Sequence, residues 1–254
     1  IQFIINEPTA AALYYGFKNG NELRGNYAVF DLGGGTFDVS IIKVNGQEID
    51  TLASCGVNRL GGDDFDRIML DLVIKKYKDQ TGKNLDKELY SLTDAKKDKK
   101  SLSKRPRVQA MVGKYPVEIK REEFEESISS LIAQAVLQCE SALDEANLTP
   151  SDIDGVFLAG GSTRIPLVAE NVEKVFKKKP VSVVNVDEVV ALGASLYAAY
   201  KSDKKHLSPL QKNSVNKLSV SELTSHYFGV EALIHNDSKN DHELQNSIII
   251  NKNE

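Results

Sequence analysis

The sequence has no tryptophan, only two methionines and two cysteines, and no long hydrophobic run. Cys55 and Cys139 are too few and too far apart to indicate a disulfide framework or a metal site, so a reducing, cytoplasmic location is expected. No apolar run approaches the roughly 20 residues that span a bilayer, and no signal peptide is visible. We therefore expect no membrane partner.

Excess positive charge is also absent. The formal net charge is -4, which argues against a general nucleic-acid-binding protein. The composition, 41% hydrophobic and 27% charged over 254 residues, is typical of a globular protein with one large or two smaller domains. The four histidines all lie after Lys201, without the spacing of metal ligands: His206, His226, His235 and His242.

The chain is organised around residues 31–40, which read Asp-Leu-Gly-Gly-Gly-Thr-Phe-Asp-Val-Ser. Strand-forming residues flank the glycines, which predicts two strands joined by a tight turn. Successive glycines let backbone N–H groups face one concavity, and Asp31 at its edge could hold a water molecule or a hydrated Mg²⁺ ion. The pattern fits a phosphate-binding loop, and it also fits an ordinary glycine-containing hairpin.

An alanine-rich helix precedes this hairpin. Residues 1–5 predict a short strand, Pro8 suits the first helical position, and Gly16 is placed to end the helix. Glu7 then lies at a strand-to-helix junction. It is either a site carboxylate or a charge that favours the helix N-terminus.

A third strand and a long helix follow the hairpin. A turn at Gly46 and residues 48–54 complete a predicted β-meander. Gly61 and Gly62 open a helix whose apolar residues recur at helical spacing as far as Tyr77. The start of this helix is either a simple cap or an anion site formed by free N–H groups.

The middle of the chain is rich in charge. The pattern predicts a helix over residues 87–103, two short strands within residues 108–119, and a long amphipathic helix over residues 121–146. Cys139 lies on the apolar face of the long helix, which indicates a core residue and not a nucleophile. Basic residues gather at the end of the first helix, a pattern typical of a solvated face: Lys96, Lys97, Lys99, Lys100, Lys104, Arg105 and Arg107.

A second candidate ligand-binding edge lies near residue 160. Residues 154–159 predict a buried strand, and a glycine-containing loop then leads into a helix that ends at Phe176. Ligands gather at the carboxyl ends of such strands, and the guanidinium of Arg164 is able to stack on a base. Residues 181–184 predict one more strand, and residues 187–200 a helix of small residues.

The composition changes after Lys201. Residues 201–218 are rich in serine, asparagine and lysine, which indicates a linker. Residues 226–234 and 247–250 predict two further strands. Two strands cannot bury a core of their own.

Four ordered motifs together resemble the seventy-kilodalton heat-shock chaperones, the DnaK family. They are Ile-Ile-Asn-Glu-Pro-Thr-Ala-Ala-Ala at residues 4–12, the stretch at 31–40, Leu-Gly-Gly-Asp-Asp-Phe-Asp at 60–66, and Leu-Ala-Gly-Gly-Ser-Thr-Arg-Ile-Pro at 158–166. The resemblance covers about residues 1–200. The Gly-Gly-Asp-Asp-Phe-Asp variant and residues 189–191 are also similar to the iron-sulfur-assembly branch of the family.

The resemblance implies an α/β fold, the actin-like (ribonuclease H-like) ATPase lobe, with a mixed sheet flanked by helices and a short β-rich C-terminal tail. It implies that residues 1–200 form the second lobe of the ATPase domain, residues 201–222 a linker, and residues 223–254 a truncated start of a β-sandwich peptide-binding domain. The other phosphate loop and the catalytic lysine belong to the family's first lobe. Half of the electrostatic clamp on the phosphates is therefore expected to be absent from this chain.

The resemblance also implies roles for individual residues. Asp31, Thr36 and Glu7 would be catalytic, with Asp31 orienting the attacking water, and Asp31, Asp38 and Glu7 would hold Mg²⁺ through water. Arg164 would lie against the adenine. The implied contacts to ATP or ADP are Gly33, Gly34, Gly35, Thr36, Gly62, Lys99, Lys100, Ser103, Gly161, Ser162, Arg164 and Asp187.

The sequence departs from the family pattern in three places. Lys96 stands where the family usually has a glutamate that contacts the ribose. The family's acidic and hydrophobic interdomain linker is not recognisable in residues 213–222, and the usual opening of the β-sandwich is altered at residues 223–229. A divergent family member is expected.

We therefore predict a fragment of a DnaK-like chaperone that binds ATP or ADP. The intact protein is expected to couple Mg²⁺-dependent ATP hydrolysis to unfolded-peptide binding, with a J-domain co-chaperone and a nucleotide exchange factor as partners. The fragment alone is expected to be inactive as an ATPase and to associate with itself. Two alternatives remain: another actin-like ATPase or kinase, and a degenerate lobe that serves as a protein-interaction platform.

Overall fold

The structure is a computed structural model that describes residues 4–19, 23–46, 48–181, 185–202, 219–221, 228–236 and 241–250. Its helices are α1 (Glu7–Asn19), α2 (Gly62–Thr81), α3 (Leu92–Leu102), α4 (Arg121–Glu145), α5 (Pro166–Phe176) and α6 (Val189–Lys201), with 3₁₀ turns η1 (Pro150–Asp152) and η2 (Gly161–Arg164). Its strands are β1 (Leu23–Leu32), β2 (Phe37–Gly46), β3 (Glu48–Val57), β4 (Arg107–Val112), β5 (Tyr115–Lys120), β6 (Ile153–Ala159), β7 (Pro180–Val181), β8 (Ser219–Ser221), β9 (Phe228–Asn236) and β10 (Asp241–Ile250).

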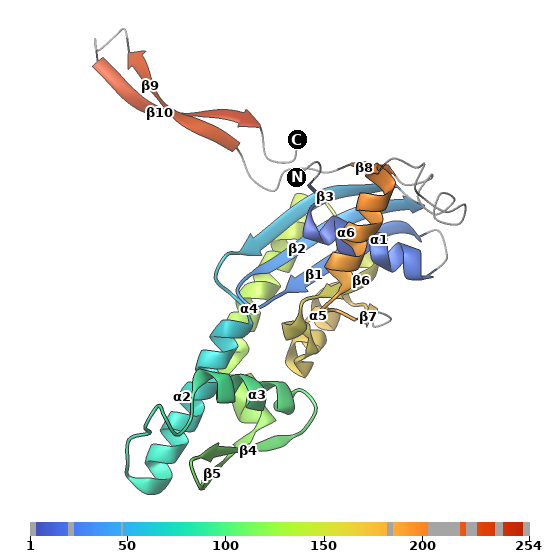
Figure 1. Ribbon diagram of the computed structural model, residues 1–254. Helices are drawn as coiled ribbons and strands as arrows, with labels where there is room; N and C mark the ends of the chain where they lie inside the picture. The colour runs from blue at the N-terminus through green and yellow to red at the C-terminus, as the bar shows by residue number, and fades with distance from the viewer. Residues whose placement is uncertain are drawn as a thin grey trace.

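A mixed sheet organises the molecule (Figure 1), with strand order β7-β6-β1-β2-β3-β8. The predicted meander is present, since β1, β2 and β3 pair antiparallel in sequence. Strand β6 pairs parallel with β1, and β7 with β6. The sheet therefore brings the carboxyl ends of β1 and β6 side by side. The glycine loop follows β1 there, and Gly160 follows β6. This confirms the predicted α/β class.

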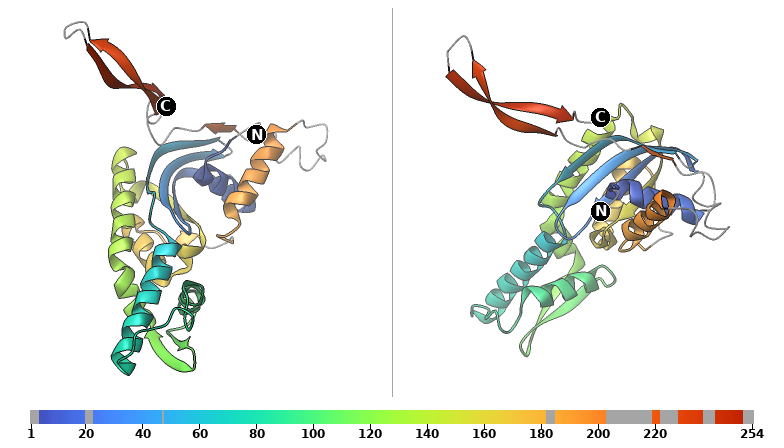
Figure 2. Two further views of the ribbon diagram at one scale, coloured as in Figure 1. Left: turned by 60° about the vertical axis from the view of Figure 1, so that its left-hand side comes forward. Right: turned by 45° about the horizontal axis from the view of Figure 1, so that its top comes forward.

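Alternating side chains give the sheet two apolar faces. Phe30 and Leu32 point to one face and belong to the larger core, which also contains apolar residues of α2, α4 and α5. Val29, which precedes Phe30, points to the other face, which α1 and α6 cover. Figure 2 shows the resulting three layers, with α4 on one side of the sheet and the α1–α6 pair on the other.

A smaller unit of α2, α3, β4 and β5 extends below the sheet (Figures 1 and 2). Helix α2 links this unit to the loop after β3, and α3 packs beside it. The helix predicted over residues 87–103 begins later, at Leu92, because Ser91 caps it: the Ser91 N–H donates to the Asp94 carboxylate at 3.0 Å, and the Asp94 N–H donates back to the Ser91 hydroxyl at 3.4 Å.

Several predicted boundaries differ in the structure. Helix α1 runs past Gly16 to Asn19, because one glycine costs a helix only about 1 kcal/mol. Residues 4–6 have no regular structure, and residues 1–3 and 182–184, the remainder of two predicted strands, lie outside the described residues.

The C-terminal region also differs from the predicted pattern. Within the predicted linker, β8 forms three parallel pairs with β3, while residues 203–218 lie outside the described residues. Strand β10 begins at Asp241, so polar residues expected in a connection belong to the strand and pair with β9. The bounds of β8 and β10 are determined by backbone pairing with β3 and β9, and the hydrophobic pattern alone did not indicate them. No helix in the described parts of the chain is long and apolar enough to cross a membrane.

Candidate functional site

The glycine loop between β1 and β2 is held by hydrogen bonds at Gly33 and is open to solvent at its tip. The Gly33 N–H donates to the Thr36 carbonyl at 3.1 Å, and the Gly33 carbonyl accepts from the Ser162 hydroxyl at 2.8 Å. Gly34, Gly35 and Thr36 are exposed, and a Cβ added to Gly35 would meet nothing within 4 Å. The tip of the loop therefore faces space that a ligand can enter.

The start of α2 abuts this loop. A Cβ on Gly61 would lie 2.5 Å from the Gly34 carbonyl oxygen, so only glycine allows this approach. The N–H groups of Gly62 and Asp63 donate to the Gly33 and Gly34 carbonyls at 3.0 and 2.7 Å. The Gly61 N–H donates to the Asp64 carboxylate at 3.0 Å. Of the two alternatives for this helix start, the structure favours the cap, because its first N–H groups already have partners.

The loop after β6 completes the opposite wall. Gly160 has a φ of 82°, and a Cβ there would overlap the Leu32 carbonyl, so this turn also requires glycine. Its N–H donates to the Val186 carbonyl at 3.0 Å. The turn places η2, and with it Ser162 and Arg164, beside the glycine loop of β1.

The Arg164 guanidinium is oriented by two hydrogen-bond acceptors. Its Nη2 donates to Asp187 Oδ2 at 2.6 Å and to Asn185 Oδ1 at 2.7 Å. The side chains of Arg164 and Asp187 are both about half exposed, at 51% and 53%. The guanidinium is therefore oriented by these two acceptors and remains half exposed, so it is available to stack on a base.

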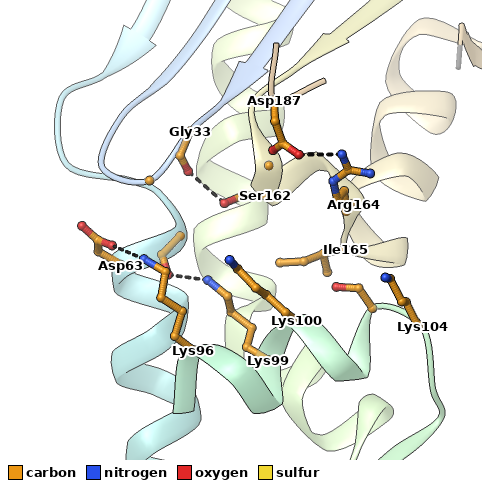
Figure 3. Close-up of a pocket in the computed structure, with 14 residues that line it drawn as sticks. Gly33, Asp63, Lys96, Lys99, Lys100, Lys104, Ser162, Arg164, Ile165 and Asp187 are labelled. Atoms are coloured by element: carbon orange, nitrogen blue, oxygen red, sulfur yellow. Dashed lines mark hydrogen bonds and ion pairs between the residues drawn. The ribbon is translucent and has the colours of Figure 1, made fainter. Parts of the chain in front are cut away.

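Helix α3 supplies a row of cations from below (Figure 3). Lys99 is buried, and its ammonium pairs with the buried Asp66 carboxylate at 2.6 Å and donates to the Gly62 carbonyl at 2.7 Å. Burial lowers the pKa of Lys99, and the Asp66 carboxylate opposes that shift. Lys96 is half exposed and lies 3.9 Å from Asp63 and 3.8 Å from Asp66. Lys99 thus ties α3 to the start of α2.

These segments enclose a cavity of about 830 Å³, shown in Figure 3, which is within the range of small-molecule sites. Its lining comes from five parts of the chain that are separated in sequence. The lining residues are Gly33, Gly34, Gly62, Asp63, Lys96, Lys99, Lys100, Ser103, Lys104, Gly161, Ser162, Arg164, Ile165 and Asp187.

A second, smaller cavity of about 190 Å³ lies at the N-terminus of α1. Three carboxylates line it: Glu7, Asp31 and Asp38, the last two directly opposite each other in the β1–β2 ladder. Burial raises the pKa of Asp31 to about 7, and the charges of Glu7 and Asp38 add to the effect. The rest of the lining is Asn6, Pro8, Ser40, Thr51 and Ser54.

Comparison with known proteins identifies the family. The model of the Hsp70 protein family matches residues 1–243. The chain belongs to the Hsp70 family. The resemblance predicted from the four motifs is confirmed at this level.

The chain is similar to curated Hsp70 relatives that are named as chaperones. It is 42% identical over 196 residues to the Chaperone protein HscA homolog of Histophilus somni (strain 129Pt), a match that covers 77% of this chain and 31% of that protein. It is 43% identical over 197 residues to the HscA homolog of Haemophilus influenzae (strain PittEE), and 41% identical over 197 residues to Chaperone protein HscA of Salmonella heidelberg (strain SL476), with the same coverage. The chain thus spans about a third of the length of these relatives.

The structure divides the predicted site residues between the two cavities. Ten predicted nucleotide contacts line the larger one, which is all of them except Gly35 and Thr36 at the exposed loop tip. The predicted magnesium and water ligands Glu7, Asp31 and Asp38 line the smaller one. The roles of these residues stay predictions.

Some residues in and beside the two cavities were not predicted from the sequence. Asp66 was seen only as part of a helix start, although its burial beside Lys99 makes it the anchor of α3. Lys104 was assigned to a solvated run, and Ile165 only to a motif. The hydroxyls of Ser40, Thr51 and Ser54 had no sequence signal, because isolated serines and threonines in strands are common.

The larger cavity fits a nucleotide in size and charge. Glycines 33–35 leave the loop tip free of Cβ atoms, and the cations of α3 face it. The smaller cavity fits Mg²⁺ only with water between ion and protein. No group of three or more direct ligands is preassembled in the described residues, and Mg²⁺ usually keeps several of its waters.

Proposed function

We propose that this Hsp70 chain forms one lobe of a nucleotide-binding site for Mg-ATP and Mg-ADP. The observation that carries the proposal is the 830 Å³ cavity, where the glycine loop, α2, α3 and η2 converge with five cations among the lining residues. Anionic phosphates favour such a site, and a planar base favours the exposed face of Arg164.

The chain's own residues supply three contributions in this proposal. The glycine loop binds phosphate oxygens at its open tip, and Lys99 holds α2 and α3 at a fixed separation below it. Arg164, oriented by Asp187, binds the adenine. Asp31 holds the attacking water, with Asp38 and Glu7 beside it. When bound, Mg²⁺ would neutralise charge on the phosphates.

We further propose that a longer Hsp70 protein containing this chain hydrolyses ATP and couples it to unfolded-peptide binding. A J-domain co-chaperone and a nucleotide exchange factor are the partners that this coupling requires. The small number of cysteines, Cys55 and Cys139 alone in 254 residues, supports the proposed cytoplasmic location. The role is either general or specialised for iron-sulfur assembly, and the choice of stimulating peptide distinguishes the two.

Titration calorimetry with Mg-ADP and Mg-ATP tests the binding site. We expect saturable binding that Arg164→Ala weakens by at least tenfold. Arg107→Ala is the matched control, because Arg107 is an exposed arginine that pairs with Glu118 outside both cavities. Absence of binding to the parent chain, or equal loss in both variants, would contradict the proposal.

Peptide-stimulated ATPase of the longer protein separates the remaining alternatives. A chaperone responds to an unfolded peptide, a kinase of the actin-like superfamily needs a small acceptor molecule, and an interaction platform hydrolyses nothing. Stimulation by an unstructured peptide would support the general role. Stimulation only by a peptide from an iron-sulfur scaffold would support the specialised one.

A further inference from the structure

The C-terminal hairpin forms a sheet of its own. In the described parts of the chain, strands β9 and β10 pair only with each other, apart from the six-stranded sheet (Figure 1). A hairpin of two strands is marginally stable by itself, because two strands cannot bury a core. An additional link between these two strands would therefore matter more for stability than it would in a larger sheet.

The register of this hairpin brings two histidines together. His235 of β9 and His242 of β10 are direct partners in the antiparallel ladder. The pairing is regular around them, and the register shift lies at the other end of the ladder, between Ile248 and Ile250. Direct partners lie on the same face of a sheet, with Cβ atoms about 4.5–5.5 Å apart. The spacing of the histidines along the sequence did not indicate this pair, because only the register creates it.

Two histidines at one register position match the ligand preference of transition metals. Neutral imidazole is the commonest protein ligand for such ions. Zinc, nickel and copper ions favour imidazole, whereas Mg²⁺ and Ca²⁺ favour oxygen ligands. A zinc ion binds a histidine nitrogen at about 2.0–2.1 Å. Two imidazoles on neighbouring strands are therefore able to share one ion of this kind.

The charge of this part of the chain also favours a cation. Asp241 and Glu243 flank His242 in the sequence. Their register partners, Asn236 and Ile234, carry no charge. Residues 234–243 contain three carboxylates and one lysine, so their formal net charge is -2 with neutral histidines. An excess of negative charge raises the local concentration of cations.

We propose that His235 and His242 form a binding site for a divalent transition-metal ion such as Zn²⁺ or Ni²⁺, and that the bound ion stabilises the register of the hairpin. Two protein ligands leave the remaining coordination positions to water. An ion held by both strands stabilises only the register in which the histidines are partners, because a shift by one residue moves one of them to the opposite face. The site does not depend on the proposed nucleotide-binding function.

Titration calorimetry on the full chain with Ni²⁺, in the presence of excess Mg²⁺, tests the site. We expect one Ni²⁺ ion to bind per chain with micromolar affinity. His235→Ala and His242→Ala should each weaken binding by about tenfold or more, and the double variant should lose little beyond either single one, because the two ligands act as a unit. His206→Ala is the matched control, since it removes a histidine outside β9 and β10. It should leave the affinity unchanged.

Moving the histidines tests the register itself. His242→Ala with Glu243→His keeps the number of histidines and shifts one of them by a single position, to the opposite face of the hairpin. This variant should bind Ni²⁺ as weakly as His242→Ala alone. Moving both histidines to the next register pair, Ile234 and Glu243, should restore binding. Restored binding would also show that the weak variants had not simply lost the hairpin.

Hydrogen exchange supplies the second measurement. Saturating Ni²⁺ should slow amide exchange in β9 and β10 and leave the other two-stranded sheet, β4 and β5, unchanged. Unchanged exchange in β9 and β10 would overturn the stabilising role of the ion. No Ni²⁺ binding to the parent chain, an equal loss in His206→Ala, or full binding by the singly shifted variant would overturn the site. Each of these results leaves the proposed nucleotide binding intact.

Discussion

At the scale of single residues, Asp31 shows how burial shifts the protonation of a carboxyl group to near neutral pH. Its pKa lies at about 7, against an ordinary value of 3.8, so the native protein keeps a proton that the unfolded chain has lost. Between about pH 4 and 7 the native state binds more protons. The free energy of unfolding therefore falls as pH rises through this range, and the loss is complete above pH 7.

Asp31→Asn should remove this pH-dependent loss of stability, because the amide does not ionise. Without Mg²⁺, we expect the variant to be more stable than the parent by up to about 4 kcal/mol at pH 8, and almost unchanged at pH 4. Urea denaturation at pH 4, 6 and 8 measures the difference. Asp71→Asn, at an exposed position of α2, is the control. A gain that does not depend on pH would show that ionisation of Asp31 is not its cause.

The Asp66–Lys99 pair is a second residue-scale feature. Asp66→Ala should lower the free energy of unfolding by about 3–5 kcal/mol, because it leaves the buried Lys99 ammonium without its carboxylate. Asp66→Leu combined with Lys99→Met should recover most of this loss, since no buried charge remains. Asp63→Ala, a neighbouring exposed carboxylate, should change stability by less than about 0.5 kcal/mol. Chemical denaturation distinguishes these cases, and a double variant as unstable as Asp66→Ala would contradict the explanation.

At the scale of elements, the contact between α1 and α6 depends on one glycine. A Cβ on Gly193 would overlap the Ala10 carbonyl oxygen, so Gly193→Ala must push the helices apart. We expect a loss of about 1–3 kcal/mol. Gly16→Ala makes the same change inside α1, where the nearest atom is Leu23 Cδ1 at 3.6 Å, and should gain about 0.5–1 kcal/mol. Thermal unfolding of both variants checks the opposite signs; equal shifts would rule out the packing explanation.

At the scale of the whole molecule, the chain covers about a third of its HscA relatives' length. We expect it to bind Mg-ADP between about micromolar and millimolar and to show negligible turnover, because one lobe stabilises phosphate charge from one side only. To compare the two catalytic rates, we would measure steady-state phosphate release from the chain and from a longer protein that contains it. A catalytic rate within tenfold of the longer protein would contradict the prediction.

Self-association is a separate whole-molecule prediction. If the chain is one lobe of a two-lobe domain, as proposed, the surface that faces the other lobe should be apolar. Ile4, just before α1, and Phe17, near its end, are 78% and 53% exposed. We expect the sedimentation coefficient to rise with protein concentration. Ile4→Ser with Phe17→Ser should weaken the association, while Leu137→Ser, on the outer face of α4, should not. A monomer at every concentration would show that the lobe stands alone.

Much of the site was predictable because short motifs carry it. The glycines at 33–35, the Gly61-Gly62 pair and the loop at Arg164 each have local chemistry that needs those residues. Asp66 was not predictable in the same way. Its burial depends on Lys99, 33 positions later, and only the packing of α3 on α2 joins them. The choice between a cap and an anion site at the start of α2 could not be made from the sequence for a similar reason, since it depends on the Gly33 and Gly34 carbonyls that accept from these N–H groups.

The sequence alone was enough to predict the family, the meander, the long helices and most of the residues that line the larger cavity. Hydrophobic period, turn chemistry and motif spacing are local properties of the chain. Only the tertiary structure decided that Glu7, Asp31 and Asp38 line a different cavity from the lysines. It also decided that Lys99 is buried and that β8 joins the sheet at β3. Those outcomes depend on contacts between distant segments. Their energies come from burial and close approach, which no local pattern encodes.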